Sequence, residues 1–208
     1  MLFRSSYAQN PQEVERWMTE EYPRIKKEAS QEKAEIFWCD ETGISNEAND
    51  KRGFSPRGQT PVLKVEVKKE RVNMISALTN QGKLRFMLYL ETMTAVLLIM
   101  FLKRLCRESG RKIYVIMDNL RVHHSKKLRK WLKANQEKIK VFYLPPYSPE
   151  LNPDESLNGR LKKEIHSGIS PRTKEAIQKR TRSFMLNQQR APCKVQKLFK
   201  HKRVRYAA

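Results

Sequence analysis

Short apolar runs that end at a polar residue recur along the chain and predict the strands of a sheet. Residues 35–40 (EIFWCD) and 112–118 (KIYVIMD) are mostly apolar and each ends in an aspartate, as in strands buried on both faces. Residues 139–144 (IKVFYL) form a third such run, which two prolines terminate. A meander of further strands is expected at Val62–Val67, Val72–Leu78 and Leu84–Leu90.

Apolar positions spaced by three and four residues predict the helices. Residues 11–34 predict an amphipathic helix, or a pair of helices broken near Pro23. Residues 93–110 predict a helix that is apolar on most sides and ends at Gly110, and residues 125–138 predict an amphipathic helix. Strands, helix, strand, helix, strand and helix in that order predict a mixed α/β fold.

The composition indicates a protein with a core and no membrane-spanning segment. Of 208 residues, 39% are apolar, and the longest apolar run, Ala95–Leu102, is far shorter than the roughly 20 residues that a spanning helix needs. The first residues show no secretory leader, so we expect a cytoplasmic protein. Cys39, Cys106 and Cys193 are odd in number and widely spaced, which argues against a disulfide framework or a zinc site and favours core positions.

The distribution of charge predicts a polyanionic partner. The chain carries 43 Lys and Arg against 22 Asp and Glu, a formal net charge of +21. Residues 156–208 hold 15 of the basic residues and two acids, so +13 of the charge lies in the last quarter. An excess of this size typically neutralises phosphates, so nucleic acid is the expected partner, ahead of an anionic membrane.

Two aspartates end predicted buried strands and are the first candidates for chemistry. If the strands that end at Asp40 and Asp118 are parallel neighbours, both carboxylates lie at the same edge of the sheet. Two ionised carboxylates this close require a proton or a cation between them, and their hard oxygen atoms favour Mg²⁺. The alternative is that each aspartate is only the polar residue at the end of its strand.

Glu155 is the third candidate, on a helix that Asn152 is expected to cap. It occupies the third helical position, where a glutamate can serve simply as part of a capping box. Against this, 100° per residue places Glu155 about 200° from the apolar stripe, so it faces away from the core. That stripe consists of Leu157, Leu161 and Ile165. The face of Glu155 also holds Gly159, Lys162 and His166, a pattern suited to a metal and a phosphate backbone.

Four longer motifs resemble a known family. They are WCDETG at 38–43, RGFSPRGQTPV at 52–62, MDNLRVHHSKK at 117–127 and YLPPYSPELNPDESLNGRLKK at 143–163. Together they resemble the catalytic domain of bacterial insertion sequence 630 family transposases, which are related to mariner-type transposases. The resemblance runs from about Trp17 to the closing VRYAA.

The resemblance implies a ribonuclease H-like fold, in which helices flank a mixed five-stranded sheet. The catalytic domain is then expected at residues 35–168. A helical N-terminal extension is expected at residues 1–34 and a basic helical C-terminal extension at residues 169–208.

The resemblance also implies an active site with a DDE triad. The family's three catalytic acids match Asp40, Asp118 and Glu155, with 77 residues between the first pair and 36 between the second. By resemblance they hold two Mg²⁺ ions, for which Mn²⁺ substitutes, and these ions activate the attacking hydroxyl and stabilise the leaving oxygen. The implied activity is cleavage of transposon ends and strand transfer into target DNA, commonly at TA, by a homodimer on double-stranded DNA.

Two positions near Glu155 need separate treatment. Many relatives carry Trp three residues after the glutamate, where this chain has Asn158, and we expect that position to bear on packing more than on chemistry. Asp154 is turned about 100° from Glu155 on the helix, so Glu155 is preferred as the triad member.

Family members begin with helix-turn-helix domains that read the DNA ends. The residues before Trp17 show no such pattern, so a separate helix-turn-helix chain is one expected partner.

Basic residues within the motifs are the expected DNA contacts. His123 and His124 follow Asp118, but Mg²⁺ prefers oxygen ligands, so a phosphate contact is the preferred role of His123. The other candidates are Arg52, Arg57, Arg121, Arg160, Lys162 and Lys163. The aromatic residues Trp38, Tyr114 and Trp131 are expected in the core.

Three functions fit this sequence. The first is a Mg²⁺-dependent DNA strand-transfer enzyme. The second is a catalytically inert transposase remnant that binds DNA through its basic C-terminal segment, although all three acids are present. The third is a ribonuclease or structure-specific nuclease on the same fold, which would prefer RNA or branched substrates.

Overall fold

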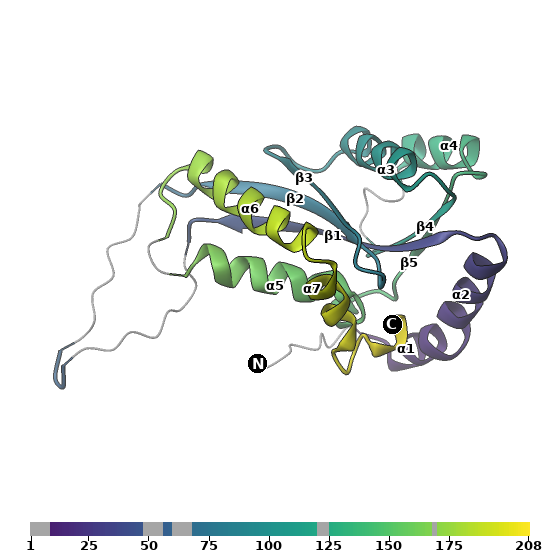
Figure 1. Cartoon of the computed structure of the whole chain (residues 1–208), viewed down its shortest axis with the longest axis horizontal. Coiled ribbons are helices and arrows are strands. Elements are labelled where there is room, and N and C mark those ends of the chain that lie inside the picture. The colour runs from purple at the N-terminus through teal and green to yellow at the C-terminus, as the bar shows by residue number, and fades with distance from the viewer. Residues whose placement is uncertain (1–8, 48–55, 60–67, 120–124, 168–169) are drawn as a thin grey trace.

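The computed structural model describes residues 9–47, 56–59, 68–119, 125–167 and 170–208, and a mixed sheet forms its centre (Figure 1). Within these residues the five strands are β1 (Glu35–Ser45), β2 (Arg71–Leu78), β3 (Leu84–Tyr89), β4 (Ile113–Met117) and β5 (Ile139–Tyr143). Their order across the sheet is β3-β2-β1-β4-β5. β1, β2 and β3 are antiparallel, whereas β4 and β5 run parallel to β1. This is the mixed five-stranded sheet that was predicted, while the strand expected at Val62–Val67 lies outside the described residues.

β1 is longer than the sequence predicts. The apolar run stops at Asp40, but the strand continues to Ser45, and residues 41–45 pair with β2. The register puts Asp40 opposite Ser76 and Ser45 opposite Arg71. The prediction that a strand ends at Asp40 is therefore wrong for β1, because antiparallel pairing with β2 extends it to Ser45, and Thr42 and Ile44 in this extension are buried.

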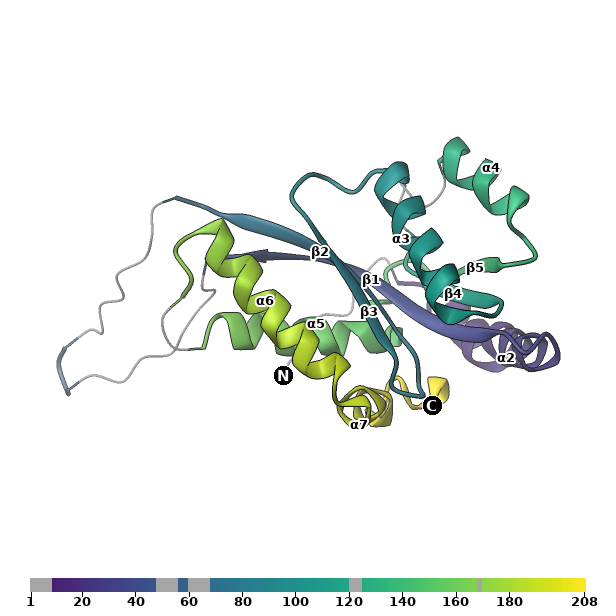
Figure 2. The ribbon, with the colours of Figure 1, turned by 45° about the horizontal axis from the view of Figure 1, so that its top comes forward.

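Two helices, α3 (Ala95–Ser109) and α4 (Lys126–Ala134), cover one face of the sheet (Figure 2). Side chains from both helices and from the strands form one core cluster, which includes Phe37, Val115, Leu102 and Leu128. α3 begins at the cap Thr94 and ends at Gly110, whose φ of 68° suits glycine, as predicted. Its outer side is not packed, because Val96 and Met100 are each about half exposed.

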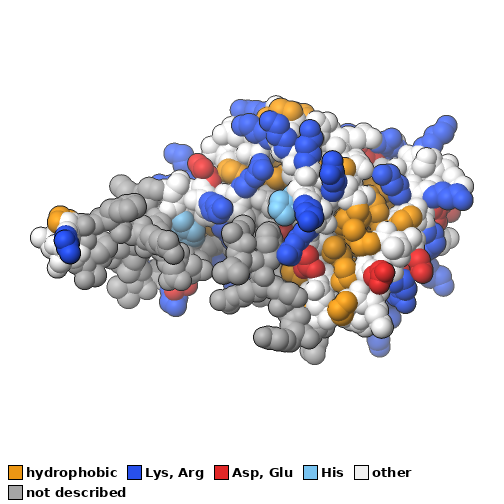
Figure 3. Space-filling model, turned by 90° about the horizontal axis from the view of Figure 1, so that it is seen from below, with side chains coloured by type: hydrophobic (Ala, Val, Ile, Leu, Met, Phe, Trp, Pro, Cys, Tyr) orange, Lys and Arg blue, Asp and Glu red, His pale blue; other side chains and the backbone are white. Residues whose placement is uncertain are grey.

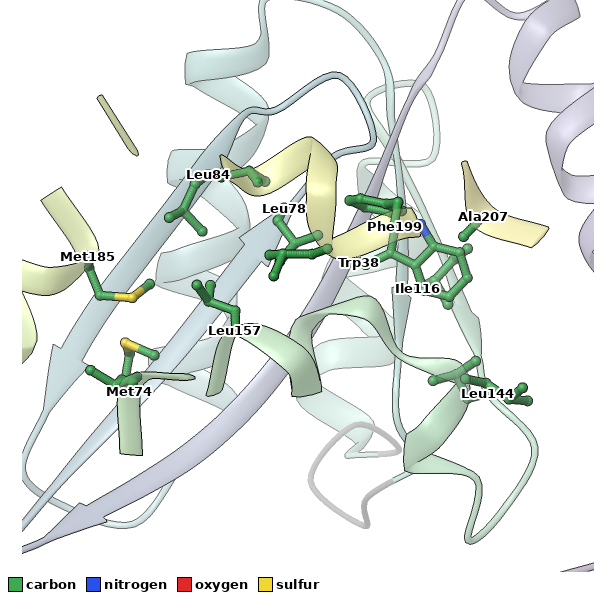
Figure 4. Close-up of a cluster of buried hydrophobic side chains, with 14 of the residues drawn as sticks. Trp38, Met74, Leu78, Leu84, Ile116, Leu144, Leu157, Met185, Phe199 and Ala207 are labelled. Carbon is green, nitrogen blue, oxygen red and sulfur yellow. The ribbon is translucent and has the colours of Figure 1, made fainter. Parts of the chain in front are cut away.

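The opposite face of the sheet is covered by α5 (Pro153–Ile165) and α6 (Lys174–Gln189), followed by α7 (Pro192–Gln196) and the 3₁₀ turn η4 (Lys197–Lys200). Figure 4 shows the core that they form with the strands: Trp38 and Ile116 from the sheet meet Leu157, Met185 and Phe199 from the helices. The predicted stripe of α5 is buried as expected, since Leu157, Leu161 and Ile165 are all inaccessible.

The N-terminal helices and the last turn of the described residues meet beside β1. The N-terminal segment is helical through α1 (Pro11–Arg16), the π-helical turn η1 (Trp17–Glu21) and α2 (Tyr22–Gln31). Pro23 does not break it, because Pro23 lies at the start of α2 and the wider turn directly before it accommodates the missing N–H. Trp17 Nε1 donates a hydrogen bond to the hydroxyl of Tyr206, which lies in the 3₁₀ turn η5 (Arg205–Ala207).

Burial agrees with only part of the core prediction. Trp38 and Tyr114 are buried as expected, while Trp131 on α4 is half-buried and packs against the edge of the core. Cys39 is buried, Cys106 is half-buried and Cys193 is exposed on α7, so a core position is wrong for Cys193. No helix within the described ranges is long and apolar enough to cross a membrane.

Candidate active site

Asp40 and Asp118 lie at the same level of two neighbouring parallel strands. β1 and β4 pair in a register that puts Trp38 beside Ile116. Asp40 and Asp118 each follow two residues later, so the register places both on the face of the sheet that α5 covers. The expectation that these two strands are parallel neighbours is confirmed.

The N-terminus of α5 brings Glu155 to the same place. Asn152 caps the helix, because its Oδ1 accepts from the backbone N–H of Asp154 over 3.0 Å. Its Nδ2 donates to the carbonyl oxygen of Cys39 over 3.0 Å, which ties the helix start to β1 beside Asp40. The backbone N–H of Asn152 already donates to Pro149 in the 3₁₀ turn η3 (Pro149–Leu151), so a capping box is not needed from Glu155. Glu155 is exposed, facing away from the core as predicted.

The three acids open into one cavity of about 490 Å³. Asp40 forms part of its floor, Asp118 and Asn119 come from the end of β4, and Glu155 comes from α5. The rest of the wall is the loop after β5 and the helix cap, formed by Leu144, Pro145, Pro146, Tyr147, Ser148, Pro149 and Asn152. The fold therefore gathers three carboxylates that are far apart in the sequence.

Asp40 is the most buried of the three acids and is held on both oxygen atoms. Its side chain is 8% exposed. Oδ1 accepts from the backbone N–H of Glu41 over 2.9 Å, and Oδ2 accepts from Nδ2 of Asn158 over 2.7 Å. Burial raises the pKa of Asp40 well above its usual range, and the negative charges of Glu155, Asp154 and Asp118 raise it further.

Asp154 and Glu155 are neighbours in the sequence but lie in different surroundings. Asp154 is fully buried against β2, where the hydroxyl of Ser76 lies 3.0 Å from both of its carboxylate oxygens. Burial raises the pKa of Asp154 well above its usual range, while the hydrogen bond from Ser76 acts in the opposite direction. Partial burial also raises the pKa of Glu155, and the charge of Lys162 opposes this shift. Only Glu155 of the two lines the cavity.

Asn158 touches a candidate catalytic acid directly, which differs from the expectation that its position serves packing more than chemistry. It is buried in the interface between α5 and the sheet, and its amide holds Asp40. A signal was present in the sequence, because Asn158 is a polar residue directly beside Leu157 of the apolar stripe. A buried polar residue without a partner is costly, so such a position predicts a specific hydrogen bond.

The site has the donor atoms that a hard divalent cation requires. Within the described residues, no three Asp, Glu, His or Cys side chains are gathered closely enough to form a metal centre as they stand. Three carboxyl groups nevertheless open to one cavity, and their mutual repulsion disfavours the charged form of Asp40. A cation bound among them would offset this repulsion, so the residues fit Mg²⁺ or Mn²⁺.

The structure places only some of the predicted DNA-contacting residues near the site. Arg160, Lys162 and Lys163 are exposed on α5, and Lys162 is near enough to Glu155 to influence its pKa. Arg57 is exposed within the short described stretch 56–59. The other three candidates, Arg52, Arg121 and His123, lie outside the described residues. On the face in Figure 3, Lys and Arg side chains are spread over the described surface, and acidic ones are fewer.

The sequence matches a family of DNA-processing enzymes. Residues 35–178, more than half of the chain, match the family model of the DDE superfamily endonucleases. The protein therefore belongs to this family. No curated protein matches the sequence.

The fold is shared with mariner transposases. The Mos1 mariner paired-end complex with Mg is 17% identical, with a TM-score of 0.70, and the match covers 100% of this chain and 66% of the Mos1 chain. The crystal structure of the Mos1 catalytic domain is 15% identical, with a TM-score of 0.62 over 99% of this chain and 98% of that one. This chain thus spans 66% of the longer Mos1 transposase and nearly all of its catalytic domain. Its sheet and flanking helices have the ribonuclease H-like fold that was expected.

Proposed function

We propose that this protein is the catalytic domain of a DNA transposase of the insertion sequence 630 family, with Asp40, Asp118 and Glu155 as its catalytic acids. It would cleave the ends of a mobile element and transfer them into target DNA. One observation carries the proposal: the β1–β4 register and the capped start of α5 bring these three acids to one cavity. Membership of the DDE superfamily endonucleases supports it.

The three acids would hold two divalent cations, which when bound activate the attacking hydroxyl and stabilise the leaving oxygen of the phosphodiester. Mos1 is known in complexes with Mg and with Mn, which supports Mg²⁺ as the cofactor and Mn²⁺ as a substitute. Asn158 keeps one oxygen of Asp40 oriented and the backbone of Glu41 fixes the other. Asn152 anchors the start of α5 to β1, so that Glu155 stays at the mouth of the cavity.

Double-stranded DNA is the proposed partner. Mos1 is known in complexes with a transposon end and in a strand transfer complex, which supports this choice. The exposed cations of α5 and the +13 charge of residues 156–208 would neutralise phosphates beside the cavity. Action as a homodimer on DNA, and end recognition by a separate helix-turn-helix chain, belong to the same proposal.

Nicking of supercoiled plasmid tests the proposal. Wild-type protein with Mg²⁺ or Mn²⁺ is expected to convert supercoiled DNA to the open circle, and EDTA is expected to stop it. Asp118→Asn removes one proposed ligand charge and should abolish nicking while DNA affinity stays close to wild type. Glu164→Gln, which neutralises an exposed acid on the same helix as Glu155, is the matched control and should nick normally.

Two other outcomes would replace the proposal. Tight DNA binding without nicking by any variant, with either metal, would support the inert DNA-binding remnant. Faster cleavage of RNA or of branched DNA than of plain duplex would support a nuclease on the same fold.

A further inference from the structure

The positive charge of the chain falls into two blocks, and the proposed function uses only one of them. Residues 103–138 contain 12 Lys and Arg and three acids, a net charge of +9. Residues 156–208 carry +13, so all other residues together carry a net charge of −1. The first block therefore contains a concentration of charge that the candidate active site and its helix α5 do not explain.

These two blocks lie on opposite faces of the sheet. The first includes the second half of α3 and all of α4, which pack on the face formed by Phe37, Ile75 and Val115. The second includes most of α5 and α6, which pack on the face formed by Trp38 and Ile116 (Figure 2). Helix and sheet layers stack about 10 Å apart, so one straight duplex laid on α5 and α6 does not reach the outer side of α3 and α4.

α4 is the densest part of the first block. Five of its nine residues are basic and none is acidic. Its buried side is formed by Leu128, while the exposed cations are Lys126, Lys127, Arg129, Lys130 and Lys133. Within the part of the chain that the structure describes, none of these five forms an ion pair. Outside this block, Lys83 and Lys140 each pair with a glutamate.

The cations continue from α4 across α3 as one surface, which we call the α3–α4 face. Lys103 and Arg107, one helical turn apart, line two adjacent hollows of about 490 and 740 Å³. The first hollow adds Arg111, Lys112 and Lys138, and the second adds Arg104 and Lys127. Arg104, Arg111 and Lys112 each pair with a glutamate, so Lys138 and Lys127 are the added cations that form no ion pair within the described residues. The face begins at the start of α4, eight residues after Asp118, and ends at Lys138, directly before β5. It thus runs from the side of the candidate active site to the opposite edge of the sheet.

We propose that the α3–α4 face binds a second DNA duplex, separate from the duplex bound beside α5. This inference rests on the proposed function, because an enzyme that joins two DNA molecules must hold both. The candidate active site lies on the face of the sheet that α5 covers, and the α3–α4 face begins eight residues after Asp118. A duplex on the α3–α4 face would therefore reach the site past the end of β4. DNA is favoured over an acidic protein because the chain belongs to the DDE superfamily endonucleases and the cations extend over two helices, from the second half of α3 along the whole of α4. Duplex DNA presents one charge per about 1.7 Å, which suits such an extended surface.

Binding stoichiometry tests this inference. The test variant is Lys126→Gln with Lys130→Gln and Lys133→Gln, in which glutamine keeps the helix propensity of lysine. The matched control is Arg24→Gln with Lys27→Gln and Lys33→Gln, which removes the same charge from exposed positions on and just after α2. The probe is a fluorescent duplex of about 12 base pairs, roughly 40 Å at 3.4 Å per base pair, titrated in EDTA so that no cleavage takes place.

Wild type and control are expected to bind two duplexes per chain, and the α4 variant one. The salt dependence of total binding should become shallower by about three in the α4 variant alone, one for each lost phosphate contact. The inference is wrong if wild type binds a single duplex, or if the α4 variant matches wild type in both quantities. An acidic protein as the true occupant of the α3–α4 face would produce that second outcome.

The same preparations separate the two proposals. Nicking that depends on Asp118, together with one duplex per chain, would overturn only the inference about the α3–α4 face. Two duplexes per chain without any metal-dependent nicking would overturn the strand-transfer function instead.

Discussion

The side-chain amide of Asn158 donates to Oδ2 of Asp40 over 2.7 Å, and this bond joins α5 to β1 inside the candidate active site. Asn158 is 1% exposed, and within the described residues its own Oδ1 has no hydrogen-bond partner. Among those residues, the side-chain amide is therefore hydrogen-bonded to Asp40 and to no other group. Asn158 is a positioning residue for the acid that it holds.

Replacing Asn158 should weaken the site more than the fold. Asn158→Ala is expected to lower the nicking rate roughly tenfold or more, because Asp40 loses the donor that orients it. It should also lower the free energy of unfolding by about 1–3 kcal/mol, since a hydrogen bond to a buried carboxylate is lost. A plasmid assay at several Mg²⁺ concentrations measures the first effect, and half-maximal nicking should require more Mg²⁺ than in wild type.

A core truncation on the other face of the sheet is the control for this experiment. Leu102→Ala removes buried apolar contacts from α3 and is expected to cost about 2–5 kcal/mol of stability. Its Mg²⁺ requirement should stay at the wild-type value at a temperature where the protein is folded. An equal shift of the Mg²⁺ requirement in both variants would mean that Asn158 has only a structural role.

Mutations of the adjacent acids Asp154 and Glu155 should have different effects on nicking. Glu155→Gln is expected to abolish nicking with the fold intact, because Glu155 is exposed at the cavity. Asp154→Asn should retain nicking, since Asp154 lies buried on Ser76. Nicking assays and unfolding midpoints measure both. The reverse pattern, with Asp154→Asn inactive and Glu155→Gln active, would move the triad by one residue.

The free energy of unfolding should depend on pH because of the acids gathered in the candidate active site. The pKa of Asp40 is raised above its unfolded value, so the folded protein binds this proton more tightly than the unfolded chain. The ionised form then destabilises the fold as pH rises from the ordinary pKa of an aspartate through the raised value. Asp40→Asn should accordingly increase the free energy of unfolding at pH 7, because it removes the charge that burial and the neighbouring acids disfavour.

The gain from Asp40→Asn should shrink as the pH falls toward 4, because protonation of Asp40 removes the buried charge from the wild-type protein. Adding Mg²⁺ or Mn²⁺ at pH 7 should raise the unfolding midpoint of wild type more than that of Asp40→Asn, because a bound cation offsets the same repulsion. Denaturant or thermal unfolding at both pH values measures these differences. A gain of equal size at pH 4 and pH 7 would contradict the assignment of the effect to charge.

The sequence predicts those parts of the site that depend on short local patterns of residues. The runs ending in Asp40 and Asp118 identify two buried strands, and their parallel pairing at equal level follows from the rules of α/β folds. Asn152 and Pro153 mark the start of α5, which fixes the direction of Glu155. Each of these patterns spans only a few consecutive residues, so it can be recognised without knowing which residues distant in the sequence are in contact.

The parts that sequence does not predict are pairings between distant residues. β1 runs past Asp40 because β2 supplies a partner, and the hydrogen bond between Asn158 and Asp40 spans 118 residues. Ser76 in β2 has no local sign that it will hold Asp154. Such polar contacts depend on the register of the sheet and on the position of α5, which no local pattern contains.

Tyr206 should contribute to stability through its hydroxyl group. It accepts from Trp17 Nε1 over 3.1 Å and donates to the carbonyl oxygen of Leu151 over 2.8 Å. Tyr206→Phe leaves both partners unpaired and should cost about 1–3 kcal/mol, measured by denaturant unfolding. Tyr147→Phe, at an exposed position, is the control and should change stability by about 0.5 kcal/mol or less. An equal loss in both variants would mean that the two buried hydrogen bonds contribute nothing.

The contact between the N-terminal helices and the C-terminal turn also ties two distant segments to one strand. Trp17 and Tyr206 are 189 residues apart, and the ring of Tyr206 packs at 84° against Trp38, two residues before Asp40. A contact at such separation is costly in loop-closure entropy, so its formation is expected to slow folding. Removal of the turn that holds Tyr206 would uncover Trp38 and so loosen β1 directly beside Asp40.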